Sequence, residues 1–423
     1  MISWILNGQP LKFSGDPEMS LLGFLRNEKH ITSAKDACSG QGACGACTVE
    51  IDGKPKLACR VKMKEIGQSE VITTEGLPEK IRQLIGETFA SKGAVQCGFC
   101  TPGFIMRMHH LIENKPFASR EEIKKAVSPN LCRCTGYVKI VDAIESALQQ
   151  IREEKRIIPA EITAEIGQSF PKYEAVATAL GERKFVDDMH FEGMLHGALL
   201  FSPHPKALIK SIDVSEAEKL AGVKAIFTSK NIPGDKFTGL IFSDWPLMIG
   251  PGETTRYIGD VLALVIAETE ETARKSLSFI KIDLEELSPV TDMHQALAED
   301  AVQVHPDRPN LLERCKIQSG NISEAFDNAV FISSGIFETQ RIEHAFLETE
   351  TAIALPDGDG IKIFSQGQGV YVDQKLIAKI LALPIEKVRV VQVSNGGGFG
   401  GKEDMTVQGH AALAAWLLKK PVK

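Results

Sequence analysis

The cysteines constrain this chain most, because eight of the nine lie before residue 135 and fall into two groups. The first group lies in the glycine-rich stretch "CSGQGACGACTVEIDGKPKLAC" and comprises Cys38, Cys44, Cys47 and Cys59. The second group is made of two close pairs and comprises Cys97, Cys100, Cys132 and Cys134. Cysteines at this density bind metal or form disulfides more often than they merely fill a core.

The first group has three thiols on one glycine-rich loop and a fourth on the following strand. Plant-type ferredoxins hold a 2Fe–2S cluster in this way, and glycines let backbone N–H groups approach the cluster sulfurs. Five residues separate Cys38 from Cys44, where the plant-type pattern has four. The spacing therefore does not determine which backbone amides of the loop contact the cluster, but it does give four cysteine ligands. Structural zinc favours two short paired knuckles, so we interpret this group as a 2Fe–2S site.

The second group, taken alone, also suits zinc. Its position on a helical bundle directly behind a ferredoxin-like module favours a second 2Fe–2S cluster and hence two clusters in series. Cys315 stands alone in an apolar context, and we predict a buried small hydrophobic residue there. We assign no metal to His109 and His110, predicted on a helix, or to His344, predicted in a strand region.

The 423 residues are too many for one ordinary core, and the sequence predicts an α+β multidomain chain. Alternating apolar residues and turns at Asn7-Gly8 and Asp52-Gly53 predict a β-grasp ferredoxin-like domain over 1–76, with a short helix over 19–28. A change to helical period predicts a four-helix bundle over 77–153. A polar, proline-marked stretch predicts a linker over 154–172, and strands alternate with helices beyond it.

Composition excludes several classes of function. The net charge of −7 offers no basic surface for nucleic acid. The start "MISWILNGQPLK" lacks the pattern of a signal peptide, and no apolar run is long enough to cross a membrane. We therefore expect a cytoplasmic protein that binds neither nucleic acid nor membrane.

The motifs "CGACTV", "QCGFCTPG" and "CRCTGYVKIVDAI" resemble the paired 2Fe–2S domains of the molybdenum hydroxylases, the xanthine dehydrogenase and aldehyde oxidoreductase family. The resemblance implies that the first cysteine group holds the outer cluster and the second group the cluster nearer the molybdenum. It also implies that Gln96 touches the pterin. An α/β hammerhead domain over 173–295 and an incomplete molybdopterin-binding domain over 296–423 are expected from the same resemblance.

The stretch "SNGGGFGGKED" contains G-x-G-x-x-G at Gly396, Gly398 and Gly401, but no acidic residue follows Asp404 to hold a ribose. A dinucleotide-binding fold is therefore the weaker interpretation. The segment also resembles the molybdopterin loop of the family, which places beside the cofactor Gly397, Gly398, Phe399 and Gly400. The stretch "EHAFLETETAIALPDGDGIKIFSQGQ" is similar to the family as well, and implies that Gln366 hydrogen-bonds a molybdenum oxo ligand. The alternative for Gln366 is an ordinary strand glutamine.

Glu403 bears most on the substrate. In xanthine dehydrogenases a glutamate at this position of "GGKE" hydrogen-bonds the purine, so the resemblance implies oxidative hydroxylation of xanthine or hypoxanthine with water as oxygen source. Glu403 and Gln366 are then the expected catalytic residues. The alternative for Glu403 is an acid at a helix N-terminus. An aldehyde or nicotinate-type substrate stays open, as does a non-catalytic electron-transfer subunit with two clusters.

The resemblance implies two 2Fe–2S clusters and molybdenum–molybdopterin, with a cytosine dinucleotide form and a selenium or sulfur ligand left open. The style of "LIFSDWPLMIGPGETTRYIGD" is similar to bacterial selenium-dependent xanthine dehydrogenases. No flavin domain is expected in this chain, so a separate FAD subunit is the expected partner. In the family the molybdenum region continues further and includes the base glutamate. We therefore expect that half on another chain, or missing from a fragment, and no turnover without it.

Overall fold

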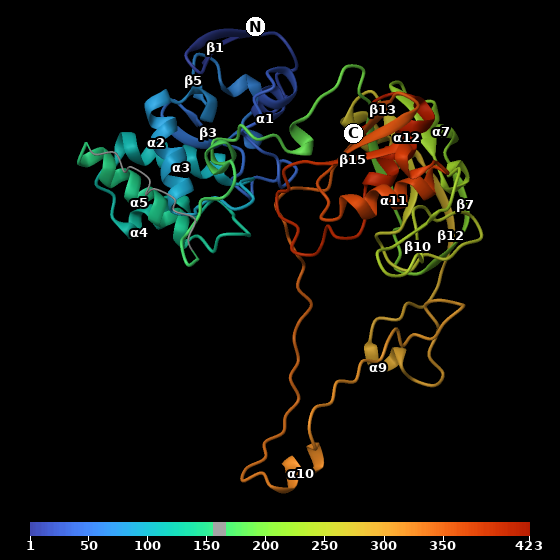
Figure 1. Cartoon of the computed structure of the whole chain (residues 1–423). Helices are drawn as coiled ribbons and strands as arrows, with labels where there is room; N and C mark the ends of the chain where they lie inside the picture. The colour runs from blue at the N-terminus through green and yellow to red at the C-terminus, as the bar shows by residue number, and fades with distance from the viewer. Residues whose placement is uncertain (155–165) are drawn as a thin grey trace. The chain divides into compact units, whose positions relative to one another are not determined.

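The computed structural model describes residues 1–154 and 166–423 (Figure 1). Its contacts divide the chain into two compact units, which are described separately. The first unit contains residues 1–195, 233–244 and 344–423. The second contains residues 196–232 and 245–343.

The first domain is the predicted β-grasp. Its five strands are β1 (Ile2–Leu6), β2 (Gln9–Phe13), β3 (Thr48–Ile51), β4 (Lys54–Leu57) and β5 (Glu70–Ile72). They form one sheet in the order β2-β1-β5-β3-β4, in which β1 and β5 are parallel. The hairpins turn at Asn7-Gly8 and Asp52-Gly53 as predicted. Helix α1 (Leu21–Gly23) continues as a π-helical turn over Phe24–Glu28, which confirms the short helix.

Four helices follow in the bundle: α2 (Glu79–Ser91), α3 (Thr101–Asn114), α4 (Arg120–Val127) and α5 (Val138–Arg152). A capping box starts α4, because Ser119 and Glu122 bond reciprocally to each other's backbone N–H. Buried apolar side chains from all four helices form one core that includes Phe89, Phe104, Ile123 and Ile144. Helix α6 (Ala175–Ala179) packs on α2, where Val176 contacts Gly86. Residues 155–165 of the predicted linker lie outside the described residues.

A cluster of buried charges joins the β-grasp to the segment after α6. Arg26 bonds to Asp187 at 2.7 Å and to Asp188 at 3.0 Å, and Lys35 also pairs with Asp188. Lys423 adds a second cation to Asp187 at 3.1 Å. Arg26 and Lys423 lower the pKa of the partly buried Asp187 to about 2, although desolvation opposes this shift. Asp187 therefore stays ionised, and its ion pairs with Arg26 and Lys423 tie this segment to the first domain.

The rest of the first unit is a small sheet covered by two helices. Strands β13 (Ala352–Asp357), β14 (Gly360–Ser365) and β15 (Val388–Gln392) lie in that order, with helices α11 (Val370–Ile380) and α12 (Gln408–Leu418) and the short strand β9 (Phe237–Thr238). The stretch "KVRVVQV" forms β15, and α12 is the last helix of the described chain. The loop from β15 to α12 carries the glycine-rich stretch.

The second unit contains two small sheets. Its elements are β6 (His196–Phe201), β7 (Ala207–Asp213), α7 (Ser215–Glu218), β8 (Val223–Phe227), β10 (Trp245–Pro246), β11 (Val261–Ala267), α8 (Glu270–Ser276), β12 (Lys281–Glu286), α9 (Met293–Ala296) and α10 (Ile322–Asp327). Strand β11 lies between β6 and β8, while β12 pairs with β7. The stretch "YIGDVLALVIAE" forms β11 and the residues after it form α8, in keeping with the predicted alternation of strands and helices beyond the linker.

The prediction of a buried Cys315 was wrong, because its side chain is exposed. It lies in an irregular stretch whose apolar neighbours are exposed too, Ile317 at 91%. An apolar sequence context buries a residue only where another element packs on it, and here the surrounding stretch is open. His344 likewise lies outside the strands, in irregular chain before β13.

Among residues 1–154 and 166–423, none of the helices combines the length and the apolar character that a membrane crossing requires.

Candidate functional site

The first cysteine group comes together in the β-grasp as two thiol pairs. Cys38 hydrogen-bonds Cys44, and Cys47 hydrogen-bonds Cys59. All four are free thiols. Cys59 lies in a 3₁₀ turn (Ala58–Arg60) directly after β4, not on the strand itself as predicted. The turn directs the sulfur of Cys59 toward the cysteine loop. On a regular strand, the side chain of Cys59 would instead point to one face of the sheet.

Backbone N–H groups of the loop point at these sulfurs. Those of Gly42 and Ala43 lower the pKa of Cys38, although burial opposes them. The N–H of Ala46 lies 3.5 Å from the sulfur of Cys44. The expected approach of loop amides to the sulfurs is therefore present despite the extra residue in the loop. Such donors stabilise negative charge on sulfur.

The second group assembles at two joints between helices of the bundle. Cys97 and Cys100 lie between α2 and α3, and the other pair, Cys132 and Cys134, lies between α4 and α5. The thiols bond across the joints, Cys97 with Cys134 and Cys100 with Cys132. The hydroxyl of Thr135 also donates to the sulfur of Cys132 at 3.1 Å.

Proton sharing within the pairs splits their pKa values. The bond between Cys47 and Cys59 raises the pKa of the first and lowers that of the second to about 7. In the bundle, the bond between Cys100 and Cys132 raises the pKa of Cys100 and lowers the pKa of Cys132. One thiol of each such pair is therefore close to a ready thiolate, the form that binds metal.

This donor set fits 2Fe–2S clusters. A cluster of this kind takes four thiolates, two on each of its two irons, and each cysteine group presents two contacting pairs. Among the described residues, no group of three or more His, Cys, Asp or Glu is arranged to hold a single metal ion.

The two cysteine groups are joined by a direct contact between the β-grasp and the bundle. The N–H of Leu131 donates to the carbonyl of Cys44 at 2.8 Å, and the Asn130 amide donates to the carbonyl of Gly45 at 2.8 Å. His109 bonds to Glu50 at 2.9 Å, a buried contact between α3 and β3. His109 therefore has a structural role, in keeping with its assignment as a non-ligand. Together these bonds hold the two cysteine loops in one rigid contact.

The glycine-rich stretch folds back on the residues after β14. Gly396 packs so closely against Glu348 and Phe99 that an added Cβ would lie 2.2 Å from the Cβ of Glu348. The carboxamide of Gln368 reaches the other side of the loop, where its oxygen accepts from the N–H of Gly400 at 3.1 Å. Phe399 is half exposed, with a left-handed φ of 56°.

Gln366, predicted to face the molybdenum, is almost fully buried at 1% exposure. Its amide donates to the carbonyl of Thr349 at 3.0 Å, and its oxygen accepts from the ammonium of Lys402 at 2.7 Å. Lys402 in turn bonds to the buried carboxylate of Glu348 at 3.0 Å. Sequence reasoning missed Gln368, Glu348 and Lys402. The repeated Gln-Gly of "SQGQG" was the available signal for Gln368.

The remaining predicted residues are accessible. Gln96 is exposed one residue before Cys97, and Glu403 is exposed in a turn after Lys402. Helix α12 begins only at Gln408, so the alternative that Glu403 caps a helix was wrong. The glycine loop also does not open directly into that helix, as a dinucleotide-binding fingerprint requires.

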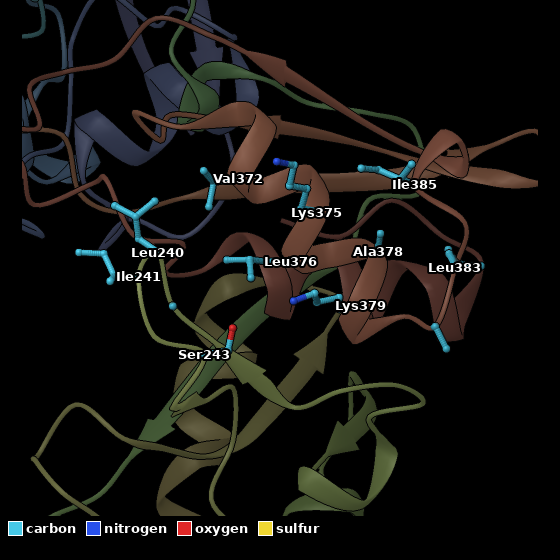
Figure 2. A pocket seen from close by; sticks show the side chains of 12 residues that line it. Leu240, Ile241, Ser243, Val372, Lys375, Leu376, Ala378, Lys379, Leu383 and Ile385 are labelled. Atoms are coloured by element: carbon cyan, nitrogen blue, oxygen red, sulfur yellow. The ribbon is translucent and has the colours of Figure 1, made fainter. Parts of the chain in front are cut away.

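A hollow of about 590 Å³ lies along α11 in the first unit (Figure 2). Residues 239–243 form one wall, and apolar side chains of α11 with Lys375 and Lys379 form the other. The N–H of Leu240 bonds to the carboxylate of Asp404 at 2.8 Å, which ties this wall to the residue after Glu403. The hollow thus adjoins the turn that carries Glu403.

Family models match most of the chain. They are a 2Fe–2S iron-sulfur cluster binding domain over 12–88, a 2Fe–2S binding domain over 73–145, the a/b hammerhead domain of aldehyde oxidase and xanthine dehydrogenase over 180–288, and a molybdopterin cofactor-binding domain over 304–423. The expected order of domains is therefore confirmed, as are the two kinds of cofactor. The exact domain boundaries stay predictions.

Similar proteins align with nearly the whole chain. The aldehyde oxidoreductase of Megalodesulfovibrio gigas is 33% identical over 99% of this chain and 48% of its own length. The solved aldehyde oxidoreductase of Desulfovibrio gigas superposes with a TM-score of 0.92 at 31% identity, over 100% of this chain and 49% of that one. The probable hypoxanthine oxidase XdhD of Escherichia coli K12 is 25% identical over 100% of this chain and 49% of its own.

The chain thus spans about half the length of these relatives. This chain itself carries two iron–sulfur domains, a hammerhead domain and a molybdopterin cofactor-binding domain, in that order. The chain therefore belongs to the molybdenum hydroxylase family, the group of the aldehyde oxidoreductases and xanthine dehydrogenases.

Proposed function

We propose that this chain is the electron-transfer and cofactor-binding part of a molybdenum hydroxylase that oxidises a purine. The thiols of each cysteine group contact each other in pairs, and this observation supports the proposed electron transfer most directly. In this proposal the outer cluster is held by Cys38, Cys44, Cys47 and Cys59, and the inner cluster by Cys97, Cys100, Cys132 and Cys134. Electrons leave the substrate site through the inner cluster and then the outer one.

The molybdopterin is held at the glycine loop, beside Gln96 and residues 397–400. When bound there, the cofactor would supply oxygen-transfer and two-electron redox chemistry. Of the two glutamines after β14, Gln366 has its amide bonded to the carbonyl of Thr349, whereas the side chain of Gln368 contacts the glycine loop at Gly400. We therefore assign the contact with the metal ligands to Gln368, and give Gln366 the role of holding Lys402 behind the loop.

Glu403 orients the substrate in this proposal. Its carboxylate is exposed in the turn that follows the glycine loop, and a carboxylate there can accept a hydrogen bond from a purine N–H. The hollow lined by Leu240 is linked to this turn through the bond from the N–H of Leu240 to Asp404. An aldehyde is the second candidate substrate, since the aldehyde oxidoreductases match the whole chain at 31–33% identity.

Replacement of Glu403 by valine tests the choice of substrate. We expect kcat/KM for xanthine or hypoxanthine to fall between about tenfold and a hundredfold, the effect of about 1.4–2.8 kcal/mol of lost hydrogen bonding. Turnover of a small aldehyde should not change. Glu386→Val, at another exposed glutamate of the first unit, is the matched control. An unchanged purine rate in the complete assembly would reject the purine assignment and leave the aldehyde.

The missing half of the family's molybdenum region is supplied by further polypeptide in this proposal, and a flavin subunit takes the electrons. Apolar side chains near the end of the second unit support a covering partner. Val330, Phe331, Ile336 and Phe337 are exposed by 84–104% in chain that has no strand partner in the described structure. Exposed apolar runs of this kind mark interaction surfaces.

A further inference from the structure

The segment 344–350 lies between the bundle cysteines and the glycine loop. On one side the guanidinium of Arg133, which stands between Cys132 and Cys134, donates to the carbonyl of His344 at 3.0 Å. On the other side Gly401 packs on the rings of His344 and Phe346. Gly396 lies between Glu348 and Phe99, next to the cysteine loop. Charged side chains of this segment therefore lie between the cluster proposed on the bundle cysteines and the molybdopterin proposed at the glycine loop.

The segment carries one half of a buried ion pair. The side chains of Lys402 and Glu348 are only 2% and 1% exposed, and their charged atoms lie 3.0 Å apart. The ammonium of Lys402 also donates to the carbonyl of Glu348 and to Gln366, and lies 4.4 Å from the centre of the Phe346 ring. The pair is held rigidly, because three acceptors meet the three N–H bonds of the ammonium.

The two oxygens of the Glu348 carboxylate have different surroundings. One carboxylate oxygen of Glu348 accepts from the N–H of Gly396 at 2.6 Å, whereas the other is buried with no hydrogen-bond partner among the described residues. Burial raises the pKa of Glu348 to about 7, although Lys402 opposes the rise. Burial lowers the pKa of Lys402, while the charges of Glu348 and Cys97 act the other way. The charge of this lysine is thus felt at a bundle cysteine.

We propose that the Lys402–Glu348 pair sets the reduction potential of the cluster on the bundle cysteines. The inference rests on the proposed function, since it requires that cluster. Reduction adds one negative charge to the cluster. A buried ammonium nearby favours the reduced state and a buried carboxylate disfavours it, because the low dielectric of the interior leaves both fields poorly screened. Both are positioning residues that act through the electric field and touch no reacting atom.

Redox titration of the full chain, followed by the EPR signals of its two clusters at pH 8.5, tests the proposal. At this pH Glu348 is ionised in its pair. Lys402→Met should make the inner cluster at least tenfold harder to reduce, a downward shift of about 59 mV for one electron. Glu348→Gln should shift the same cluster upward by a similar factor. The outer cluster, ligated from the β-grasp, should keep its potential in both variants.

The double variant Glu348→Gln/Lys402→Met guards against misfolding, because it leaves no unpaired buried charge. Its inner cluster should return to within about threefold of the parent, since the two opposite effects cancel. Lys375→Met, at an exposed lysine of α11, should change neither potential. Shifts of both clusters in one direction, or unchanged potentials in the two single variants, would overturn the inference. A parent chain without any cluster signal would instead overturn the proposed function on which it rests.

Discussion

Replacing Cys100 by alanine should halve the iron content of the chain, from about four to about two irons, and remove one of two EPR signals. Cys100 is buried at the start of α3 and is bonded to Cys132 across the joint. Three thiolates cannot complete the ligand shell of both irons, so the inner cluster should be lost entirely. The outer cluster should stay, because its four cysteines all lie in the β-grasp.

Cys315→Ser is the control for this experiment, since Cys315 is exposed and far along the sequence from both groups. It should retain the full iron content. Retention of two distinct cluster signals in the Cys100→Ala chain would show that the bundle cysteines do not ligate a cluster as proposed. Zinc instead of iron bound to the bundle cysteines would contradict the proposed cluster as well.

Gly45→Ala should destabilise the iron–sulfur half by about 3 kcal/mol, measured as earlier loss of the visible cluster absorbance on denaturation. Gly45 has a φ of +73°, which costs a residue with a side chain about 1–2 kcal/mol. Its added Cβ would also lie 2.7 Å from the carbonyl oxygen of Pro129 and 2.8 Å from Asn130. Overpacking against backbone atoms adds roughly 1–3 kcal/mol, because such atoms cannot move aside.

Gly53→Ala separates these two causes. Gly53 has nearly the same φ, +70°, but nothing lies within 4 Å of the position of its Cβ. We expect the backbone cost alone there, about 1–2 kcal/mol. The difference between the two variants measures how tightly the outer cysteine loop packs on the bundle. Equal losses would contradict the close contact between the two cluster domains.

Local sequence signals carried most of the fold. The turns at Asn7-Gly8 and Asp52-Gly53, the capping box at Ser119 and the apolar period of the bundle each act within a few residues. Their elements therefore appear where the sequence predicts them. The cysteine spacings worked for the same reason, because a short loop brings its own thiols together.

The charges of the site could not be found in this way. Lys402 and Glu348 are 54 residues apart, and Lys35 and Asp188 are 153 apart, so only the tertiary fold reveals each pair. The choice between Gln366 and Gln368 likewise depends on which of the two side chains points inward after β14. The sequence repeats Gln-Gly there, so it does not distinguish the two glutamines. Exposure of Cys315 depended on the absence of packing elements around it.

The central claim is that this chain holds two 2Fe–2S clusters and molybdenum. Elemental analysis of iron and molybdenum, on the chain purified from its native host with whatever remains bound, tests it most directly. We expect about four irons and about one molybdenum for each chain, together with a bound second polypeptide. About four irons without molybdenum or a partner would contradict the claim. The chain would then be a carrier with two clusters, and the roles proposed for Gln368, Phe399 and Glu403 would fall.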